Sequence, residues 1–320
     1  MASRKTLGLV LGSGASRGWA HIGIIEALEE AKIPIDLIAG SSVGAYIGAI
    51  YAGGGLHSLK EFLMKMDGKK IFSYVDVAIS RSGLLDGTKK VDELFSQHTD
   101  AVTFADLHIP LVMVATDLER ARKVVLKTGN LIDALRATMS YPGLFTPAMV
   151  DGKWLVDGGV IDPVPVGIAR AMGVDVVVAV DLNTRTVSHH KNGVRSGKRK
   201  GAGEPQTVGS SRKKEPRRHP IMDKISAYAS SVENVFKDSN NAEQNGRVHP
   251  PEIIETVSTA ISIMEERITR VNLAVDGPDI LIQPRLGEMK MMNFDQVNYA
   301  IKEGYVGAQE KIKDILAILQ

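Results

Sequence analysis

The chain has 320 residues, of which 44% are hydrophobic, and its 39 Lys and Arg against 37 Asp and Glu give a formal net charge of +2. It contains no cysteine, which excludes disulfides, thiolate metal sites and a cysteine nucleophile. The apolar run at Leu7–Leu11 is shorter than a signal-peptide core, and no window approaches the roughly 20 apolar residues of a membrane-spanning helix. We therefore expect a cytoplasmic protein, either free or in peripheral contact with the inner membrane face.

Apolar segments alternate with amphipathic ones through the first half of the chain. In chain order, the pattern predicts a strand at 7–11, a helix at 17–31, a strand at 36–39, a helix at 43–52, strands at 111–116 and 124–126, a helix at 131–139, a strand at 154–156, a helix at 166–172 and a strand at 174–180. Because several of these strands are apolar on both faces, they belong in a mostly parallel sheet that helices cover. The predicted fold class is a three-layer α/β/α sandwich.

The C-terminal part adds helices and one strand. Residues 252–274 follow two prolines and carry apolar side chains at the spacing of one helix face. Residues 279–283 are expected to form a strand, and residues 294–319 one or two closing helices. We expect residues 221–320 to complete the same domain as residues 1–183.

The stretch between these parts, residues 184–220, is strongly basic. Eleven Lys and Arg against two Glu give it a local charge of +9, which leaves −7 on the rest of the chain. With few apolar residues it is expected to be disordered. It is either a solvated insertion or a segment whose residues 185–218 contact anionic lipid headgroups. Nucleic-acid binding is not expected, because no aromatic residue interleaves the charges to stack on bases.

A pentapeptide, Gly40-Ser41-Ser42-Val43-Gly44, directly follows one predicted strand and precedes a predicted helix. This context is typical of a nucleophile elbow, in which Gly40 and Gly44 leave room for a sharp turn that exposes the hydroxyl of Ser42. The helix N-terminus also favours negative charge developing on Ser42. The alternative is a turn with no chemical role, and the flanking elements favour Ser42 as a nucleophile.

A glycine-rich loop, with Gly12, Ser13 and Gly14, follows the first strand. Backbone N–H groups in such a loop can hold a phosphate or an oxyanion. Arg17 stands where a dinucleotide fingerprint has its third glycine, and no Lys followed by Ser or Thr marks a P-loop. We therefore expect an oxyanion hole, because the loop ends a strand beside the nucleophile strand.

A nucleophilic serine needs a base. None of the eight histidines stands in a Gly-flanked loop just after a strand, whereas the segment Asp157-Gly158-Gly159 does. The two glycines let the carboxylate approach another backbone closely. A carboxylate with the ordinary pKa of about 3.9 is a weak base, so Asp157 has to be partly desolvated or bonded directly to the serine. The alternative is an ordinary turn residue.

Together, the segments GSGASRGWAHIG, GSSVG and DGG resemble the patatin-like phospholipase family, and its small bacterial single-domain members in particular. The resemblance covers residues 5–183 and includes residues 140–147. It implies a patatin-like catalytic core at residues 1–183 with Ser42 as nucleophile, Asp157 as base and no histidine. The oxyanion donors would come from Gly12, Ser13 and Gly14. Arg17 would brace that loop or neutralise a lipid phosphate.

The predicted function is therefore hydrolysis of a lipid ester through an acyl-enzyme intermediate, as in a phospholipase A, a lysophospholipase or an esterase. No metal or cofactor is expected, because the acidic residues and histidines show no ligand spacing. Two alternatives remain open. One is a catalytically weak regulatory or membrane-binding protein of the same fold that binds acyl ligands or anionic lipid, and the other is a nucleotide-binding enzyme that uses the glycine-rich loop.

Overall fold

A computed structural model describes residues 4–65, 88–184, 253–287, 289 and 293–320. In this part of the chain, strands form one sheet whose hydrogen-bonded order is β5-β6-β3-β2-β1-β7-β8, with β4 paired to β3. The strands are β1 (Leu7–Leu11), β2 (Leu37–Ser41), β3 (Leu111–Asp117), β4 (Arg122–Leu126), β5 (Ala148–Val150), β6 (Lys153–Asp157), β7 (Val176–Val180) and β8 (Ile280–Ile282). The pairs among β8, β7, β1, β2 and β3 are parallel, and those that involve β4, β5 and β6 are antiparallel.

Helices cover both faces of the sheet. They are α1 (Ala20–Glu30), α2 (Val43–Ala52), α3 (Leu56–Lys65), α5 (Thr88–Ser96), α6 (Leu131–Met139), α7 (Val166–Ala171), α9 (Ile253–Val275), α10 (Val297–Gln309) and α11 (Ile312–Leu319). The described part of the chain also contains three short 3₁₀ helices, η1 (Ala15–Trp19), η2 (Phe104–Asp106) and η3 (Gly158–Val160). None of the helices in the described residues combines the length and the apolar character needed to cross a bilayer.

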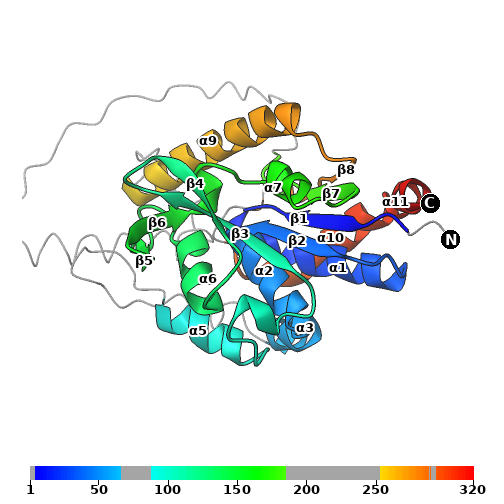
Figure 1. The fold of residues 1–320 in the computed structure, drawn as a ribbon, viewed down its shortest axis with the longest axis horizontal. Coiled ribbons are helices and arrows are strands. Elements are labelled where there is room, and N and C mark those ends of the chain that lie inside the picture. Colours follow the sequence, from blue (N-terminus) through cyan, green and yellow to red (C-terminus); the bar gives the residue numbers. More distant parts are fainter. Residues whose placement is uncertain (1–3, 66–87, 185–252, 288, 290–292) are drawn as a thin grey trace, which may run out of the picture.

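The alternation of side chains along β1 explains the layers. Leu7, Leu9 and Leu11 join an apolar cluster with α1, α2 and α10, whereas Val10 joins a second cluster on the opposite face with α7 and Leu273 of α9. Figure 1 shows α7 and α9 on one side of the sheet and α1, α2 and α10 on the other. The predicted three-layer α/β/α sandwich with a mostly parallel sheet is therefore confirmed.

Some local predictions were wrong. The single helix expected at residues 17–31 is divided into η1 and α1, which meet at Trp19 and Ala20, and α1 ends at Glu30. Helix α3 was not predicted, although it starts directly after the glycines that end α2. The short strand β5 and helix α5 were not predicted either. The basic segment 185–218 lies outside the described residues, so its contact with anionic lipid stays a prediction.

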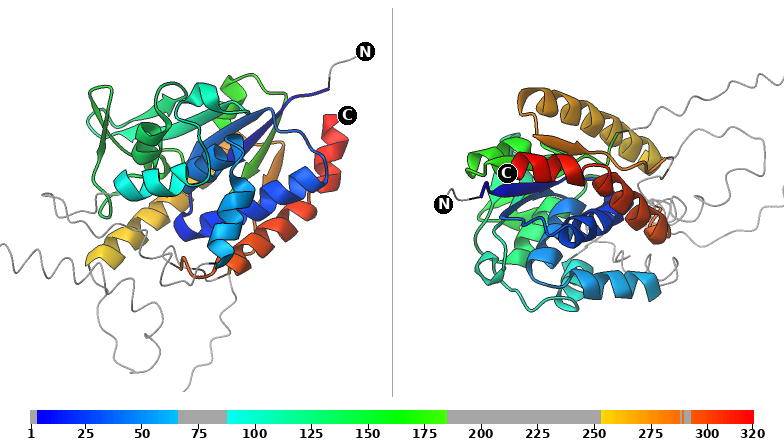
Figure 2. Two further views of the ribbon diagram at one scale, coloured as in Figure 1. Left: turned by 90° about the horizontal axis from the view of Figure 1, so that it is seen from below. Right: turned by 90° about the vertical axis from the view of Figure 1, so that its right-hand side faces the viewer.

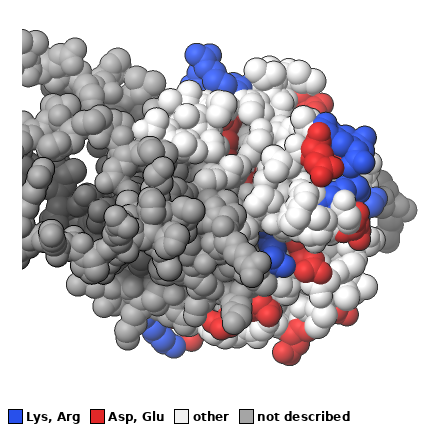
Figure 3. Space-filling view, turned by 90° about the vertical axis from the view of Figure 1, so that its left-hand side faces the viewer, with Lys and Arg blue, Asp and Glu red and all other residues white. Residues whose placement is uncertain are grey.

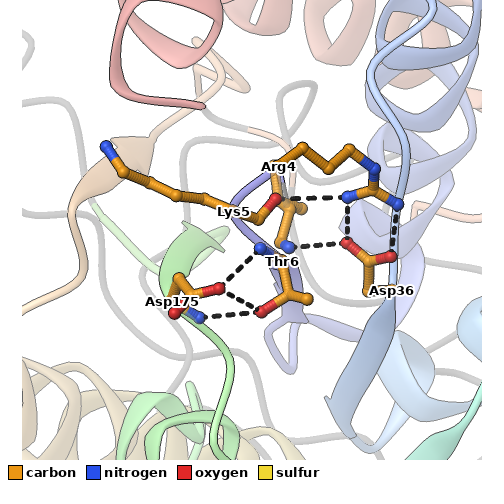
Figure 4. Close-up of polar contacts among 6 residues, drawn as sticks. Arg4, Lys5, Thr6, Asp36 and Asp175 are labelled. Atoms are coloured by element: carbon orange, nitrogen blue, oxygen red, sulfur yellow. Dashed lines mark hydrogen bonds and ion pairs between the residues drawn. The ribbon is translucent and has the colours of Figure 1, made fainter. Parts of the chain in front are cut away.

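Polar contacts at the start of three neighbouring strands fix the alignment of the sheet (Figure 4). Arg4 donates two hydrogen bonds to the carboxylate of Asp36, just before β2, and the same carboxylate accepts from the N–H of Leu7. Asp175, just before β7, accepts from the N–H and the hydroxyl of Thr6. The strands β2, β1 and β7 thus start level with one another, and the loops that follow them leave the sheet at one edge.

Strand β3 brings two distant segments together. Its residue Val114 pairs with Ser41 of β2, and the next residue, Ala115, pairs with Asp157 of β6. Since β4 pairs along the opposite edge of β3, strands β2 and β6 follow each other along the same edge. The residue after β2, Ser42, therefore lies beside Asp157.

Helices α1 and α10 lie side by side, as Figure 2 shows from two further directions. A methyl group at Gly304 of α10 would lie 2.0 Å from the carbonyl oxygen of Ala20, whereas one at Gly307 would come no closer than 3.4 Å to any atom outside the helix.

We therefore expect Gly304→Ala to lower the free energy of unfolding by about 1–3 kcal/mol through overpacking. Gly307→Ala, on the same helix, is the matched control and should be neutral or stabilising by up to about 1 kcal/mol, because alanine favours the helix. Urea denaturation of the two variants measures both values. Equal effects would contradict the close packing of α1 on α10.

Candidate active site

Ser42 occupies a strained turn between β2 and α2. Its backbone has φ 55° and ψ −128°, a conformation that costs a residue with a side chain about 1–3 kcal/mol. The turn is possible because Gly40 and Gly44 have no side chains: a Cβ on Gly40 would lie 2.5 Å from Ala45, and one on Gly44 would lie 2.1 Å from the carbonyl oxygen of Leu11. The sequence predicted this close packing at both glycines.

Two hydrogen bonds hold the turn in place. The N–H of Ser42 donates to the hydroxyl of Thr138 at 2.9 Å, and that hydroxyl donates to the carbonyl of Val114 at 2.6 Å. The side chain of Thr138 is fully buried, so these bonds are protected from water. Helix α6 and strand β3 together therefore support the backbone at Ser42.

The carboxylate of Asp157 faces Ser42 directly. The hydroxyl of Ser42 donates to Oδ2 at 2.6 Å, and the N–H of Gly159 donates to Oδ1 at 2.7 Å. The backbone of Asp157 is fixed as well, because its N–H donates to Ser140 and its carbonyl accepts from the hydroxyl of Thr116. Gly158 is needed at its position, since a Cβ there would lie 2.3 Å from the carbonyl oxygen of Val114.

Burial changes the basicity of this carboxylate. Asp157 is only 1% exposed, and the loss of hydration raises its pKa to about 7, although the hydrogen bonds from Ser42 and Gly159 lower it in part. A carboxyl group with a pKa near neutrality is a much stronger base than one with the ordinary value of 3.8. Asp157 is thus both desolvated and bonded directly to Ser42, the two conditions under which a carboxylate can act as a base here.

The glycine-rich loop differs from its predicted use. The N–H of Gly12 donates to the carbonyl of Val180, and the N–H of Ser13 donates to the carbonyl of Pro163. Because both groups are already bonded within the protein, they are not free to hold an oxyanion, and the prediction for these two donors was wrong. Among the described residues no acceptor pairs with the N–H of Gly14.

Arg17 lies against this loop. Its Nη2 donates to the side-chain oxygen of Asn183 at 3.0 Å, and its backbone N–H donates to the carbonyl of Gly14. The side-chain nitrogen of Asn183 in turn donates to the hydroxyl of Ser13. The residues just after β7 and the start of η1 thus hold the loop from two sides.

His21 lies in α1, and the sequence did not predict a role for it in the site. Its side chain is fully buried in α1, and its Nε2 lies 2.8 Å from the carbonyl oxygen of Gly12. Since a carbonyl oxygen only accepts, Nε2 carries the hydrogen. Burial lowers the pKa of His21 from 6.5 to about 4, although the bond to Gly12 raises it in part, so the imidazole is neutral at physiological pH. His21 therefore supports the loop and does not contact Ser42.

The described residues hold no group of three or more His, Asp or Glu that could bind a metal ion. Of the other histidines, His189, His190, His219 and His249 lie outside the described residues. Among the described residues, the side chains that form hydrogen bonds with Ser42 are those of Asp157 and Thr138.

Comparison with known proteins assigns the family. The family model for "Patatin-like phospholipase" matches residues 9–170, and the chain belongs to this family. It is 38% identical over 182 residues to an "uncharacterized NTE family protein" of Mycobacterium tuberculosis, covering 57% of this chain and 50% of that protein. It is 34% identical over 188 residues to "Lysophospholipase NTE1" of Pyricularia oryzae, covering 56% of this chain and 12% of that protein. The chain therefore spans half or less of these relatives.

Among solved structures, VipD from Legionella pneumophila matches with a TM-score of 0.47 and 14% identity, over 98% of this chain and 67% of that one. All the segments that carry the sequence resemblance (residues 12–23, 40–44 and 157–159) lie inside the region that the family model matches.

The neutral state of His21 leads to a prediction about acid stability. The imidazole of His21 binds a proton near pH 6.5 in the unfolded chain but only near pH 4 in the folded chain. As the pH falls from 6.5 to 4, His21 therefore lowers the free energy of unfolding, by about 3 kcal/mol at most. His21→Gln keeps a donor for Gly12 and removes the titration. Between pH 7 and pH 4.5 the variant should lose less free energy of unfolding than the wild type.

Urea denaturation at the two pH values measures the difference. The control is His57→Gln, since the side chain of His57 is 84% exposed, and it should follow the wild type. Equal acid sensitivity of His21→Gln and the wild type would show that His21 is not buried as a neutral group.

Proposed function

We propose that the protein is a serine lipid acyl hydrolase, of the phospholipase A, lysophospholipase or esterase type, that uses Ser42 and Asp157 as a catalytic dyad. The observation that carries the proposal is the direct 2.6 Å hydrogen bond from the Ser42 hydroxyl to the buried Asp157 carboxylate. Nucleophilic catalysis by a serine requires a hydroxyl that is hydrogen-bonded to a base, and the base works best when its pKa lies near the pH of the reaction. Membership of the patatin-like phospholipase family supports the same reaction.

In the proposed reaction, Ser42 attacks the ester carbonyl while Asp157 accepts the hydroxyl proton. The protonated Asp157 then gives this proton to the departing alcohol or lysolipid, which leaves the acyl group on Ser42. Water then attacks the acyl-enzyme and loses a proton to Asp157. As the bond between the acyl group and Ser42 breaks, Asp157 gives this proton to the Ser42 oxygen, and the fatty acid is released from the restored enzyme. Each step balances without a metal or cofactor.

The oxyanion donors that we propose are the N–H groups of Gly14 and Val43. Gly14 is kept from the predicted set of Gly12, Ser13 and Gly14, whereas the N–H groups of Gly12 and Ser13 are occupied. Val43 follows the nucleophile and begins α2, so its N–H and the helix N-terminus favour negative charge at the same point. One such donor contributes about 2.7–4 kcal/mol to the stability of a transition state. Arg17 acts in this scheme as a support of the loop.

The surface around the site supports an apolar substrate. Strand β1 starts beside the N-terminus at the right of Figure 1, so the carboxyl ends of the parallel strands, and Ser42 with them, face left. Figure 3 shows the molecule from that side: much of the visible described surface is uncharged, and the charged groups gather toward its edges. Met149 of β5 and Trp154 of β6, which pair with each other, have exposed side chains. The name of the fungal relative, a lysophospholipase, supports a lipid ester as substrate.

A fluorophosphonate probe tests the nucleophile. We expect the wild type to be labelled at Ser42 and Ser42→Ala to be unlabelled, with kcat/KM for a short-chain ester lower by about 10³-fold or more. Asp157→Asn should lower kcat/KM by about 10²–10⁴-fold, because the base is lost. Peptide mass spectrometry locates the probe.

The matched control is Ser41→Ala, which removes the neighbouring hydroxyl. That hydroxyl is buried and has no hydrogen-bond partner among the described residues, so its loss should leave labelling intact. Labelling of Ser42→Ala at the wild-type rate would refute the proposed nucleophile.

The pKa of Asp157 predicts the pH dependence of the reaction. The base must be ionised to accept a proton, and burial raises its pKa to about 7, so kcat/KM should rise with pH through a midpoint near 7. A stopped assay with an uncharged ester from pH 5 to pH 9 measures the midpoint. A midpoint near the ordinary carboxyl value would mean that Asp157 is hydrated in the working enzyme.

A further inference from the structure

A second buried acid lies next to the dyad, on a helix beyond the region that the family model matches. Glu265 belongs to α9 and is only 3% exposed. Helix α9 crosses the loop that follows Asp157: Asn272 donates to the carboxylate of Asp162, and the hydroxyl of Tyr141 donates to the carbonyl of Ser258. These contacts fix the helix, and Glu265 with it, over η3.

Gly159 shows how near the two acids are. A Cβ built on this glycine would lie 2.5 Å from Oε1 of Glu265 and 3.1 Å from Oδ1 of Asp157. Both carboxyl groups therefore lie against Gly159. Oε1 of Glu265 and Oδ1 of Asp157 are no further apart than the sum of these two distances. Any residue larger than glycine would displace one of the two acids.

The charged groups that act on Glu265 come from two other elements. Burial and, to a lesser extent, the charge of Asp157 raise the pKa of Glu265 to about 8, although the charge of Arg17 on η1 lowers it in part. Tyr141, from the loop after α6, stays protonated because burial and the charges of Glu265 and Asp157 raise its pKa. Asp162, in the loop after η3, is paired with Lys123. Near neutral pH, the state in which only one of the two carboxyl groups, Asp157 or Glu265, is ionised is thus favoured over the state in which both are.

We propose that Glu265 is a positioning residue that acts through Asp157: the two carboxyl groups compete for the single negative charge of the buried pair, and Glu265 thereby sets the pH at which the dyad becomes active. The competition is unequal because Asp157 accepts hydrogen bonds from Ser42 and Gly159. In the fraction of molecules in which Glu265 carries the charge, Asp157 is protonated. It cannot accept the proton of Ser42 in those molecules. The catalytic part of this inference rests on the proposed function of Asp157 as the base.

The test uses Glu265→Gln, which keeps the shape and removes the charge. The matched control is Glu266→Gln, since Glu266 is the next residue of the same helix and pairs with Arg270. Removing the competitor should lower the pH midpoint of kcat/KM, with no such change in the control. An unchanged midpoint in Glu265→Gln would overturn the catalytic part of the proposal.

Stability provides a second measurement that needs no ester hydrolysis. The folded pKa of Glu265 lies above its ordinary value of 4.5, so the ionised group destabilises the protein progressively from about pH 4.5 to about pH 8. The melting temperature of Glu265→Gln relative to the wild type should therefore be higher at pH 8 than at pH 5, by about 5 °C or more. Glu265→Met, which also removes the charge, should show the same trend.

The double variant Asp157→Asn, Glu265→Gln reports the repulsion itself. At pH 8 each single substitution removes the repulsion between the two charges, so the two gains in stability should sum to more than the gain of the double variant. At pH 4 the effects should be additive, because both groups are protonated. Additive effects at both pH values, or a loss of stability in Glu265→Gln and Glu265→Met that is equal at every pH, would overturn the proposal whether or not the protein hydrolyses esters.

Discussion

The contact between the Ser42 hydroxyl and the Asp157 carboxylate depends on one edge of strand β3. Strand β2 pairs with the first part of that edge and β6 with the rest, so two residues that are 115 positions apart in the sequence become neighbours. No side chain stands between them, which makes the short segment around Val114 and Ala115 the structural basis of the site. A shift of β6 by one residue would turn Asp157 to the opposite face of the sheet.

The site concentrates groups that raise the free energy of the folded chain. Ser42 has a strained backbone, Asp157 and Glu265 are buried carboxyl groups with raised pKa values, and His21 is a buried neutral imidazole. The apolar clusters on the two faces of the sheet and the close packing of α1 on α10 stabilise the fold against these costs. Such a distribution is expected where function, and not stability, determines the residues.

The sequence predicted the features that depend on residues close together in the chain. The periodicity of apolar residues and the flanking glycines placed β1, α2 and α6 at their observed bounds, and Ser42 followed from its strand and helix neighbours. Contacts between distant segments could not be predicted in this way. The acceptors that occupy the loop amides, at Val180 and Pro163, lie far along the chain, and nothing in the pattern of α9 distinguishes Glu265 from a solvated acid. Burial of a polar residue depends on what packs over it, which no single segment encodes.

The most direct measurement of the dyad is a crystal structure of the protein after reaction with a phosphonate ester. The account predicts phosphorus bonded to the Ser42 oxygen, the phosphoryl oxygen within hydrogen-bond distance of the Gly14 and Val43 amides, and Asp157 still beside the serine oxygen. A structure in which a histidine lies between Ser42 and Asp157, or in which phosphorus is bonded to another residue, would contradict it.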